Sequence, residues 1–175
     1  MRSKIVPLIA SLVAVVLQIV VAPVISFSDV VPNFLVALVI VLSIVRSPDT
    51  TYLYAFVLGL LSDLFSQTPL GLTPLLLLVA SFVLSRAFEA LDRDSITMAC
   101  IAAAVTAFVF EIIFAIVLLI VGYSASFFDL LIYRALPIGV YNTLLCIALY
   151  LLSRKFSFGQ PSSDAWTVSS SHRYR

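Results

Sequence analysis

The chain alternates between long apolar runs and short polar segments, and this pattern predicts six helices. A membrane-spanning helix needs about 20 apolar residues, and most of the runs approach or exceed that length. The second and third runs have only 14 residues each, or about 21 Å at the rise of an α-helix. We therefore expect an all-α, six-transmembrane-helix bundle with a short-helix hairpin at 32–65. The predicted helices span residues 5–22, 32–45, 52–65, 72–88, 96–121 and 134–153.

The sequence does not decide how residues 32–65 lie relative to the bilayer, and it predicts an unusual position for residues 122–133. Two short helices in succession are typical either of a locally thinned membrane or of a protein-lined, partly re-entrant hairpin. Residues 122–133 contain Phe127, Phe128 and Tyr133, an aromatic pattern that predicts an interfacial segment at the level of the lipid headgroups. The last helix is expected to begin after it, at Arg134.

Composition narrows the class of protein. Hydrophobic residues make up 62% of the chain, and the mean hydropathy is +1.17, far above the values of soluble domains. The 11% of charged residues and the net charge of +1 exclude a nucleic-acid-binding surface, which needs a basic stripe. We expect one integral-membrane bundle at 1–155, followed by a polar, disordered cytoplasmic tail at 156–175.

The distribution of basic residues predicts the orientation. With both termini in the cytoplasm, nine of the ten Lys and Arg residues fall on the inner side, and only Arg134 falls outside. The first run is long for the apolar part of a secretory signal, so we interpret it as a retained span of a multi-pass membrane protein. The inner residues are Arg2, Lys4, Arg46, Arg86, Arg93, Arg154, Lys155, Arg173 and Arg175.

Small and polar residues recur along one face of several predicted helices, as they do where membrane helices approach closely. In two helices this face includes an acid, Asp63 or Glu111, which should therefore face protein, water or a partner instead of lipid. The third helix carries Ala55, Gly59 and Asp63, and the fifth carries Ala99, Ala103, Ala107, Glu111 and Ala115. The first carries Pro7, Ser11, Ala14, Gln18 and Ala22, and the last carries Gly139, Asn142, Thr143, Cys146 and Tyr150.

A short motif surrounds Asp63. Gly59-x-x-x-Asp63 is followed by Pro69-Leu70-Gly71-Leu72, where proline and glycine predict a tight hairpin before the next helix. This arrangement resembles the signature of the MreD family, the integral-membrane members of the bacterial rod-shape machinery.

The resemblance covers residues 5 to 155. Pro32-Asn33, which opens a short apolar helix, occupies a Pro-Asp or Pro-Asn position of that family. Glu111 in the fifth span and Asn142 in the last span complete the match.

The resemblance implies a non-enzymatic scaffold subunit of the cell-elongation machinery, which synthesises peptidoglycan in rod-shaped bacteria. It implies a complex with an MreC-like membrane protein, and through it contact with MreB filaments, RodA and a class B transpeptidase. Its partners would also include membrane lipids, but no cofactor. The family is further similar to the six-helix substrate-binding subunits of energy-coupling-factor transporters. Pro32, Asn33, Gly59, Asp63, Pro69, Gly71, Glu111, Arg134 and Asn142 are the structural or partner-contact candidates.

The residues alone leave three roles open for Asp63 and Glu111. They could fix helix packing through hydrogen bonds or contact a partner, they could relay protons or ions, or Asp63 could pair with Arg134 on the outer side. No hydrolase motif is present, and Cys100 and Cys146 lie in apolar runs without metal-ligand spacing, so no catalytic or metal site is expected. The alternative functions are a small-molecule transport subunit, using Asp63, Arg134 and Asn142, and a lipid-binding membrane protein.

Overall fold

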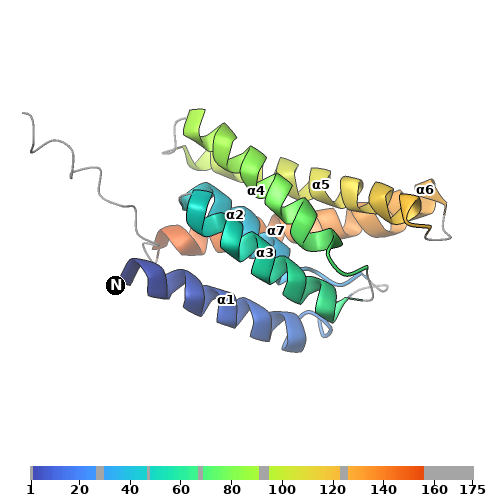
Figure 1. Ribbon diagram of the computed structural model, residues 1–175, viewed down its shortest axis with the longest axis horizontal. Helices are drawn as coiled ribbons and strands as arrows, with labels where there is room; N and C mark the ends of the chain where they lie inside the picture. Colours follow the sequence, from blue (N-terminus) through green and yellow to red (C-terminus); the bar gives the residue numbers. More distant parts are fainter. Residues whose placement is uncertain are drawn as a thin grey trace, which may run out of the picture.

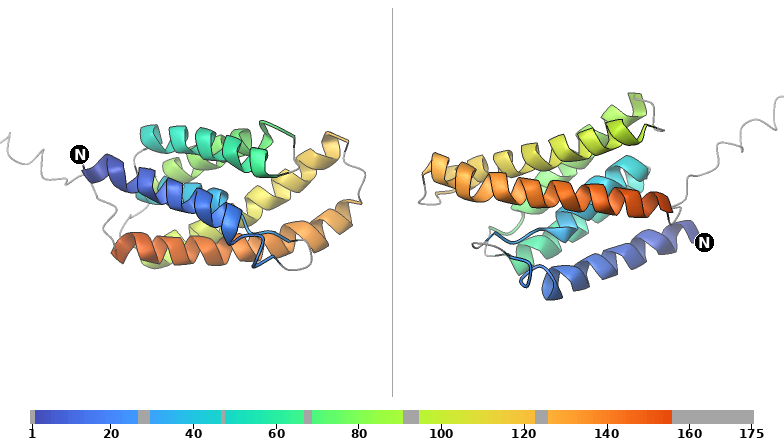
Figure 2. Two further views of the ribbon diagram at one scale, coloured as in Figure 1. Left: turned by 90° about the horizontal axis from the view of Figure 1, so that it is seen from below. Right: turned by 180° about the vertical axis from the view of Figure 1, so that it is seen from behind.

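The computed structural model describes residues 2–26, 30–46, 48–66, 69–90, 95–122 and 126–155, and helices dominate these residues. Successive long helices run in alternating directions along the long axis of the molecule (Figure 1). The start of the first helix and the end of the last therefore lie at the same end (Figure 2). The tail predicted at 156–175 lies outside the described residues. The elements are α1 (Arg2–Val20), α2 (Phe34–Val45), α3 (Pro48–Phe65), α4 (Leu72–Ala90), α5 (Ile96–Ile120), α6 (Phe127–Asp129), η1 (Leu130–Ala135) and α7 (Leu136–Lys155).

The short helix α2 is the core of the bundle. It packs against α1, α3, α4, α5 and α7, and every residue from Phe34 to Ile44 is buried. A helix that is hydrophobic on all sides is stable only when other elements surround it, and Ser43 is the one polar residue in α2. The surrounding helices therefore cover the faces of α2.

The third helix is longer than the sequence pattern predicts. We expected it to begin at Tyr52, but α3 begins at Pro48 and has 18 residues, so only α2 of the predicted hairpin is short. The reason is local, because proline is favoured at the first helical position, where a missing N–H costs nothing. Asp49 follows in the first turn, where a negative charge is favourable.

The last helix also begins earlier than expected. It starts at Phe127 instead of Arg134, and α6, η1 and α7 form one continuous helical segment, so 127–133 is not a separate interfacial segment. The π-helical turn η1 lies just before Pro137, and Leu136 donates its N–H to the carbonyl of Leu131, five residues back. Because proline cannot donate to the carbonyl four residues before it, a wider turn at this point keeps the helix unbroken.

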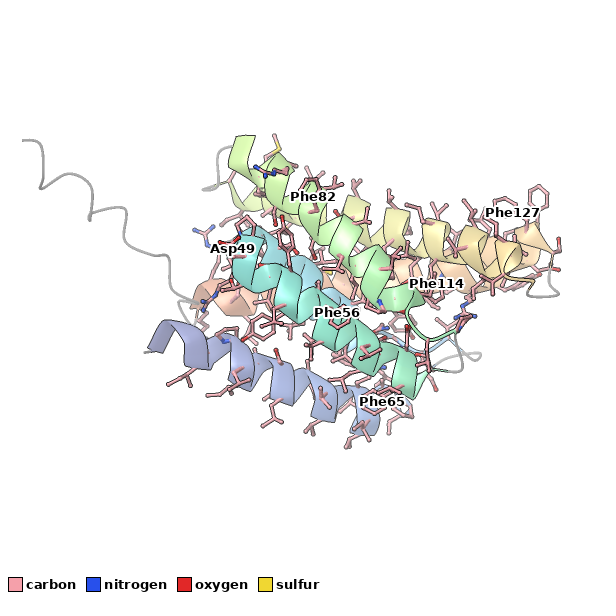
Figure 3. All side chains as sticks on the ribbon, in the orientation of Figure 1. Asp49, Phe56, Phe65, Phe82, Phe114 and Phe127 are labelled. Atoms are coloured by element: carbon pink, nitrogen blue, oxygen red, sulfur yellow. The ribbon has the colours of Figure 1, made fainter. Side chains whose placement is uncertain are left out.

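The outer surface is apolar. Leu12 of α1, Leu53 of α3 and Leu144 of α7 are each more than 60% exposed, and Phe56 and Phe82 lie on the outer face in Figure 3. Two helices of the described chain, Ile96–Ile120 and Phe127–Lys155, are long and apolar enough to cross a membrane. Such a continuous apolar exterior is suited to contact with lipid.

Candidate functional site

Asn33 connects three helices at the start of α2. Its Oδ1 accepts hydrogen bonds from the N–H groups of Leu35 and Val36, at 3.1 Å each, and so caps the helix. Its Nδ2 donates to Oγ of Ser62 in α3 at 2.7 Å. Its backbone N–H donates to Oδ1 of Asn142 in α7 at 3.0 Å. A single residue thus fixes the position of α2 relative to two of its neighbours.

Gln18 and Glu111 extend this arrangement to α1 and α5. The Gln18 side chain accepts a bond from the N–H of Phe34 at 2.8 Å and donates to the carbonyl of Pro32 at 3.3 Å. On the other side, Nδ2 of Asn142 donates to Oε1 of Glu111 at 2.8 Å. We call Gln18, Asn33, Ser62, Glu111 and Asn142 the polar network, and it joins α1, α2, α3, α5 and α7.

Asp63 lies outside the polar network and organises its own hairpin. Its Oδ2 accepts hydrogen bonds from the N–H of Gly71 at 2.7 Å and of Thr73 at 3.3 Å. The carboxylate is 1% exposed, and its other oxygen has no hydrogen-bond partner among the described residues. Asp63 therefore ties the end of α3 to the start of α4 through backbone groups, and the carboxylate cancels part of the positive field at the start of that helix.

The turn inside this hairpin requires glycine. The N–H of Leu72 donates to the carbonyl of Pro69 at 3.4 Å, and Gly71 between them has a φ of +96°. A positive φ at the third residue is the feature of type II turns and favours glycine. Pro69 and Gly71 thus shape the backbone that the Asp63 carboxylate binds.

Gly59 determines how closely α3 and α4 approach. A Cβ atom at Gly59 would lie 2.5 Å from Cα and 2.8 Å from N of Pro74, so only hydrogen fits there. Pro74 is the third residue of α4, a position where proline is tolerated because the first N–H groups of a helix have no intrahelical partner. At Gly59 the backbone of α3 is therefore in direct contact with the backbone of α4.

Arg134 lies in the π-helical turn and faces the same region. Its guanidinium carbon is 5.6 Å from the ring centre of Phe114 in α5, a cation–π arrangement. It also attracts the Glu111 carboxylate electrostatically, although no ion pair joins Arg134 to Glu111 or Asp63 among the described residues. The Asp63–Arg134 pairing considered from the sequence is absent, because Asp63 is bound to its own hairpin.

A cavity of about 870 Å³ opens beside the polar network. Its wall contains aromatic side chains, such as Phe110 and Phe114, together with charged and amide groups. A volume of this size is within the range of small-molecule sites. The polar network and its surroundings contribute Gln18, Asn33, Ser62, Glu111, Asp129 and Arg134 to the wall.

Most of the sequence candidates meet, but in two groups. Asn33, Glu111 and Asn142 belong to the polar network, with Pro32 bound to it through its carbonyl. Gly59, Asp63, Pro69 and Gly71 belong to the α3–α4 hairpin. Ser62, adjacent to Asp63, links the two groups through Asn33. Phe114 and Asp129 were not expected at this site, and nothing in their local sequence distinguishes them from other residues of their kind.

Comparison with known proteins decides the family. A family model described as rod shape-determining protein MreD matches residues 2–158. The chain belongs to the MreD family. The Asp63 hairpin, Asn33, Glu111 and Asn142 therefore belong to a rod shape-determining membrane protein, and the MreD family is not a known enzyme family. No curated protein and no solved structure matches the chain, so the similarity of this MreD protein to energy-coupling-factor subunits stays a prediction.

Proposed function

We propose that the protein is a non-enzymatic scaffold subunit of the cell-elongation machinery and binds an MreC-like membrane protein. The proposal rests on the hydrogen bonds that the two buried acids make. Asp63 binds two backbone N–H groups of its own hairpin, and Glu111 binds Asn142. Both carboxylates thus hold helices in place, which gives the bundle a defined outer surface for a partner.

The proposed assembly follows from membership of the MreD family. Through the MreC-like partner, the protein would connect to cytoplasmic MreB filaments, to RodA and to a class B transpeptidase, and so take part in peptidoglycan synthesis. We propose that the bundle comprises residues 1–155 and that residues 156–175 are a cytoplasmic tail. The bundle presents an apolar exterior that can receive a membrane helix of the partner.

Two variants of Asp63 test the scaffold role. Asp63→Asn keeps an oxygen that accepts the bonds from Gly71 and Thr73, so rod shape and co-purification of the MreC-like partner should both persist. Asp63→Leu removes the acceptor and leaves two N–H groups unpaired, so both readouts should be lost. Glu111→Gln should behave like Asp63→Asn, because its amide oxygen still accepts the bond from Asn142.

The readouts are cell shape, in cells whose only copy is the variant, and the amount of partner that co-purifies. A transport mechanism would instead require the negative charge itself. Round cells from Asp63→Asn or Glu111→Gln, with normal partner binding, would count against the scaffold.

The polar cavity supports a second candidate function, a small-molecule-binding or transport subunit. Arg134 and Glu111 place a basic and an acidic group on its wall, as a site for a polar solute needs. Arg134→Gln removes the positive charge, whereas Lys155→Gln removes one at the other end of the last helix. Under this function, Arg134→Gln alone should abolish activity without changing the amount of protein or bound partner.

We further propose six spans with both termini in the cytoplasm. The common location of the start of α1 and the end of α7 supports this topology, as does the nine-to-one distribution of basic residues. In a background without Cys100 and Cys146, Ser126→Cys and Gln67→Cys should react with an impermeant thiol reagent added to intact cells. Asp94→Cys and Ser163→Cys should not react, and labelling of Asp94→Cys would overturn the topology.

A further inference from the structure

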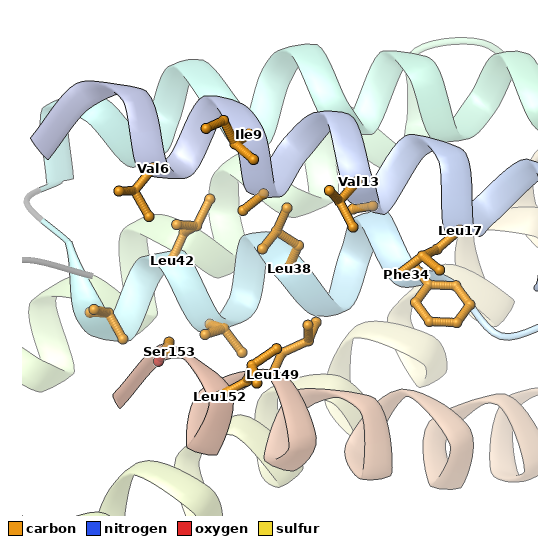
Figure 4. A pocket seen from close by; sticks show the side chains of 14 residues that line it. Val6, Ile9, Val13, Leu17, Phe34, Leu38, Leu42, Leu149, Leu152 and Ser153 are labelled. Carbon is orange, nitrogen blue, oxygen red and sulfur yellow. The ribbon is translucent and has the colours of Figure 1, made fainter. Parts of the chain in front are cut away.

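An apolar groove runs between α1 and α7, from Val6 and Val45 at one end to Leu17 and Phe34, next to the polar network, at the other. Its volume is about 470 Å³, and Ser153 is the one polar residue among the described residues of its wall. Figure 4 shows Val6, Ile9 and Val13 of α1 on one side of the groove. Leu38 and Leu42 of α2 form its floor, and Leu149 and Leu152 of α7 form the other side.

The groove exists because α1 stands apart from α7. Within the described part of the chain, α1 packs mainly against α2, so the surface between α1 and α7 has no protein cover. The side chains at the mouth are open to the surroundings, with Ile9 55%, Val13 49% and Leu152 48% exposed. In a bilayer this mouth faces the lipid, because the residues around it are apolar as well.

Basic residues mark one end of the groove. Ser153, at the groove, is followed by Arg154 and Lys155 in the last turn of α7, and both are exposed. Neither has an acidic partner among the described residues. The described wall of the groove is therefore apolar apart from Ser153, and two basic residues follow it in the last turn of α7.

We propose that this groove binds an anionic phospholipid. One acyl chain lies on α2 between α1 and α7, and the phosphate group lies at the basic end beside Arg154 and Lys155. Basic sites between membrane helices recognise anionic headgroups in this way. Because lipid tails are as apolar as the groove, the tail gains little from leaving the bilayer. The charges thus determine which lipid is preferred, and the shape of the groove determines where it is held.

The test measures lipid retained by the full-length protein. The protein is reconstituted in nanodiscs containing equal amounts of phosphatidylglycerol and phosphatidylethanolamine, and the lipid that remains bound is identified by native mass spectrometry. We expect phosphatidylglycerol to be retained several-fold more than phosphatidylethanolamine. The double variant Arg154→Gln, Lys155→Gln should still retain lipid but without this preference. Equal retention of the two lipids by the unmodified protein would overturn the proposal.

A pair of adjacent leucines provides the matched control for the groove. Leu152→Trp fills the groove and should lower the retained phosphatidylglycerol several-fold. Leu151 is 50% exposed and does not line the groove, so Leu151→Trp should leave retention unchanged. Equal retention by both variants would show that the lipid binds elsewhere.

A second pair of variants, on α1, distinguishes loss of lipid binding from misfolding. Val13 lines the groove, whereas the neighbouring Leu12 is 68% exposed and does not. Val13→Trp should repeat the loss of lipid and Leu12→Trp should not, with equal thermal unfolding temperatures for the two. If the groove variants keep their phosphatidylglycerol but lose a co-purifying membrane protein, the groove binds a partner helix and the lipid proposal is wrong.

Discussion

Helices α3 and α5 carry the same pattern and use it differently. Each places small residues at intervals of four before a single buried acid, Asp63 in α3 and Glu111 in α5. Asp63 binds backbone N–H groups 8 and 10 residues further on, in the adjacent helix α4 and the turn before it. Glu111 binds the side chain of Asn142, 31 residues further on, in α7. The first contact is local and made by the backbone, and the second is distant and made by side chains.

The glycines at the two helix crossings repeat this difference. A Cβ at Gly59 would meet the backbone of Pro74, whereas a Cβ at Gly139 of α7 would meet the Phe108 ring at 2.8 Å. A backbone atom moves only with its whole helix, but a ring can rotate or shift. The α3–α4 pair should therefore be rigid, and the α5–α7 pair should adapt to small changes.

The largest effect is expected for alanine at these two glycines. Overpacking typically lowers the free energy of unfolding by about 1–3 kcal/mol. Gly59→Ala should lower it by about 3 kcal/mol or more, because the two helices must separate. Gly139→Ala should cost about 1 kcal/mol or less, because Phe108 is half-buried and can shift. Thermal unfolding in detergent measures both. Equal losses for the two variants would show that the pairs do not differ in rigidity.

A somewhat smaller loss is expected from overpacking the stripe of α5. Ala107 is 0% exposed and lies one turn before Glu111, so Ala107→Leu should destabilise the α5 interface by about 2 kcal/mol. Ile113 is 41% exposed, and Ile113→Leu should be neutral. The folded yield after detergent extraction compares the two. The idea that this face of α5 is the packed one fails if both variants give the wild-type yield.

Local signals in the sequence were sufficient to predict the α3–α4 hairpin and the buried small-residue face of α5. Gly59, Asp63 and the Pro69-Leu70-Gly71 turn lie within thirteen consecutive positions, and their partners are near enough for the spacing to indicate them. The buried stripe of α5 was also predicted, because the period of a helix places Ala99, Ala103 and Ala107 on one face. The start of α3 at Pro48 was missed, although proline followed by an acid is a recognised helix start.

Contacts between distant helices could not be predicted from the residues. The bond between Asn142 and Glu111 depends on the rotation of two helices about their axes and on their relative height in the bundle. The π-helical turn that turns Arg134 toward Phe114 is equally hidden, because a proline in a helix can also produce a kink. The cavity depends on the packing of these helices and on the π-helical turn together, so no single sequence motif predicts it.

An intermediate effect is expected at the distant contact. Asn142→Leu removes the acceptor of the Asn33 N–H and the donor to Glu111, and should cost about 1–2 kcal/mol because such bonds in membrane proteins average about 0.6 kcal/mol each and their partners remain buried. The hydroxyl of the neighbouring Thr143 has no partner in the described part of the chain, so Thr143→Val should be neutral. Thermal unfolding again provides the measurement. A neutral Asn142→Leu would mean that the polar network contributes little to the stability of the bundle.

The smallest effect is expected for alanine substitutions in the turns that follow α3 and α5. Gly71 and Gly122 have nearly the same φ, +96° and +99°, and a Cβ atom at either position would meet no other atom within 4 Å. Alanine at either position should therefore cost only the conformational penalty of the left-handed region, about 1 kcal/mol. The turns differ in what holds them, because the N–H of Gly71 donates to the Asp63 carboxylate at 2.7 Å, whereas that of Gly122 donates to the carbonyl of Leu119 at a helix end.

A helix end can fray and relieve the strain, but a turn bonded to a buried carboxylate cannot. Gly71→Ala should therefore show the full penalty, and Gly122→Ala should show less. Combining Gly71→Ala with Asp63→Asn should give a smaller loss than the sum of the two single losses, because the weaker amide acceptor lets the turn relax. Strict additivity, measured by thermal unfolding of the four proteins of this cycle, would show that the carboxylate does not hold the turn. In that case the contrast between α3 and α5 would rest on the glycine crossings alone.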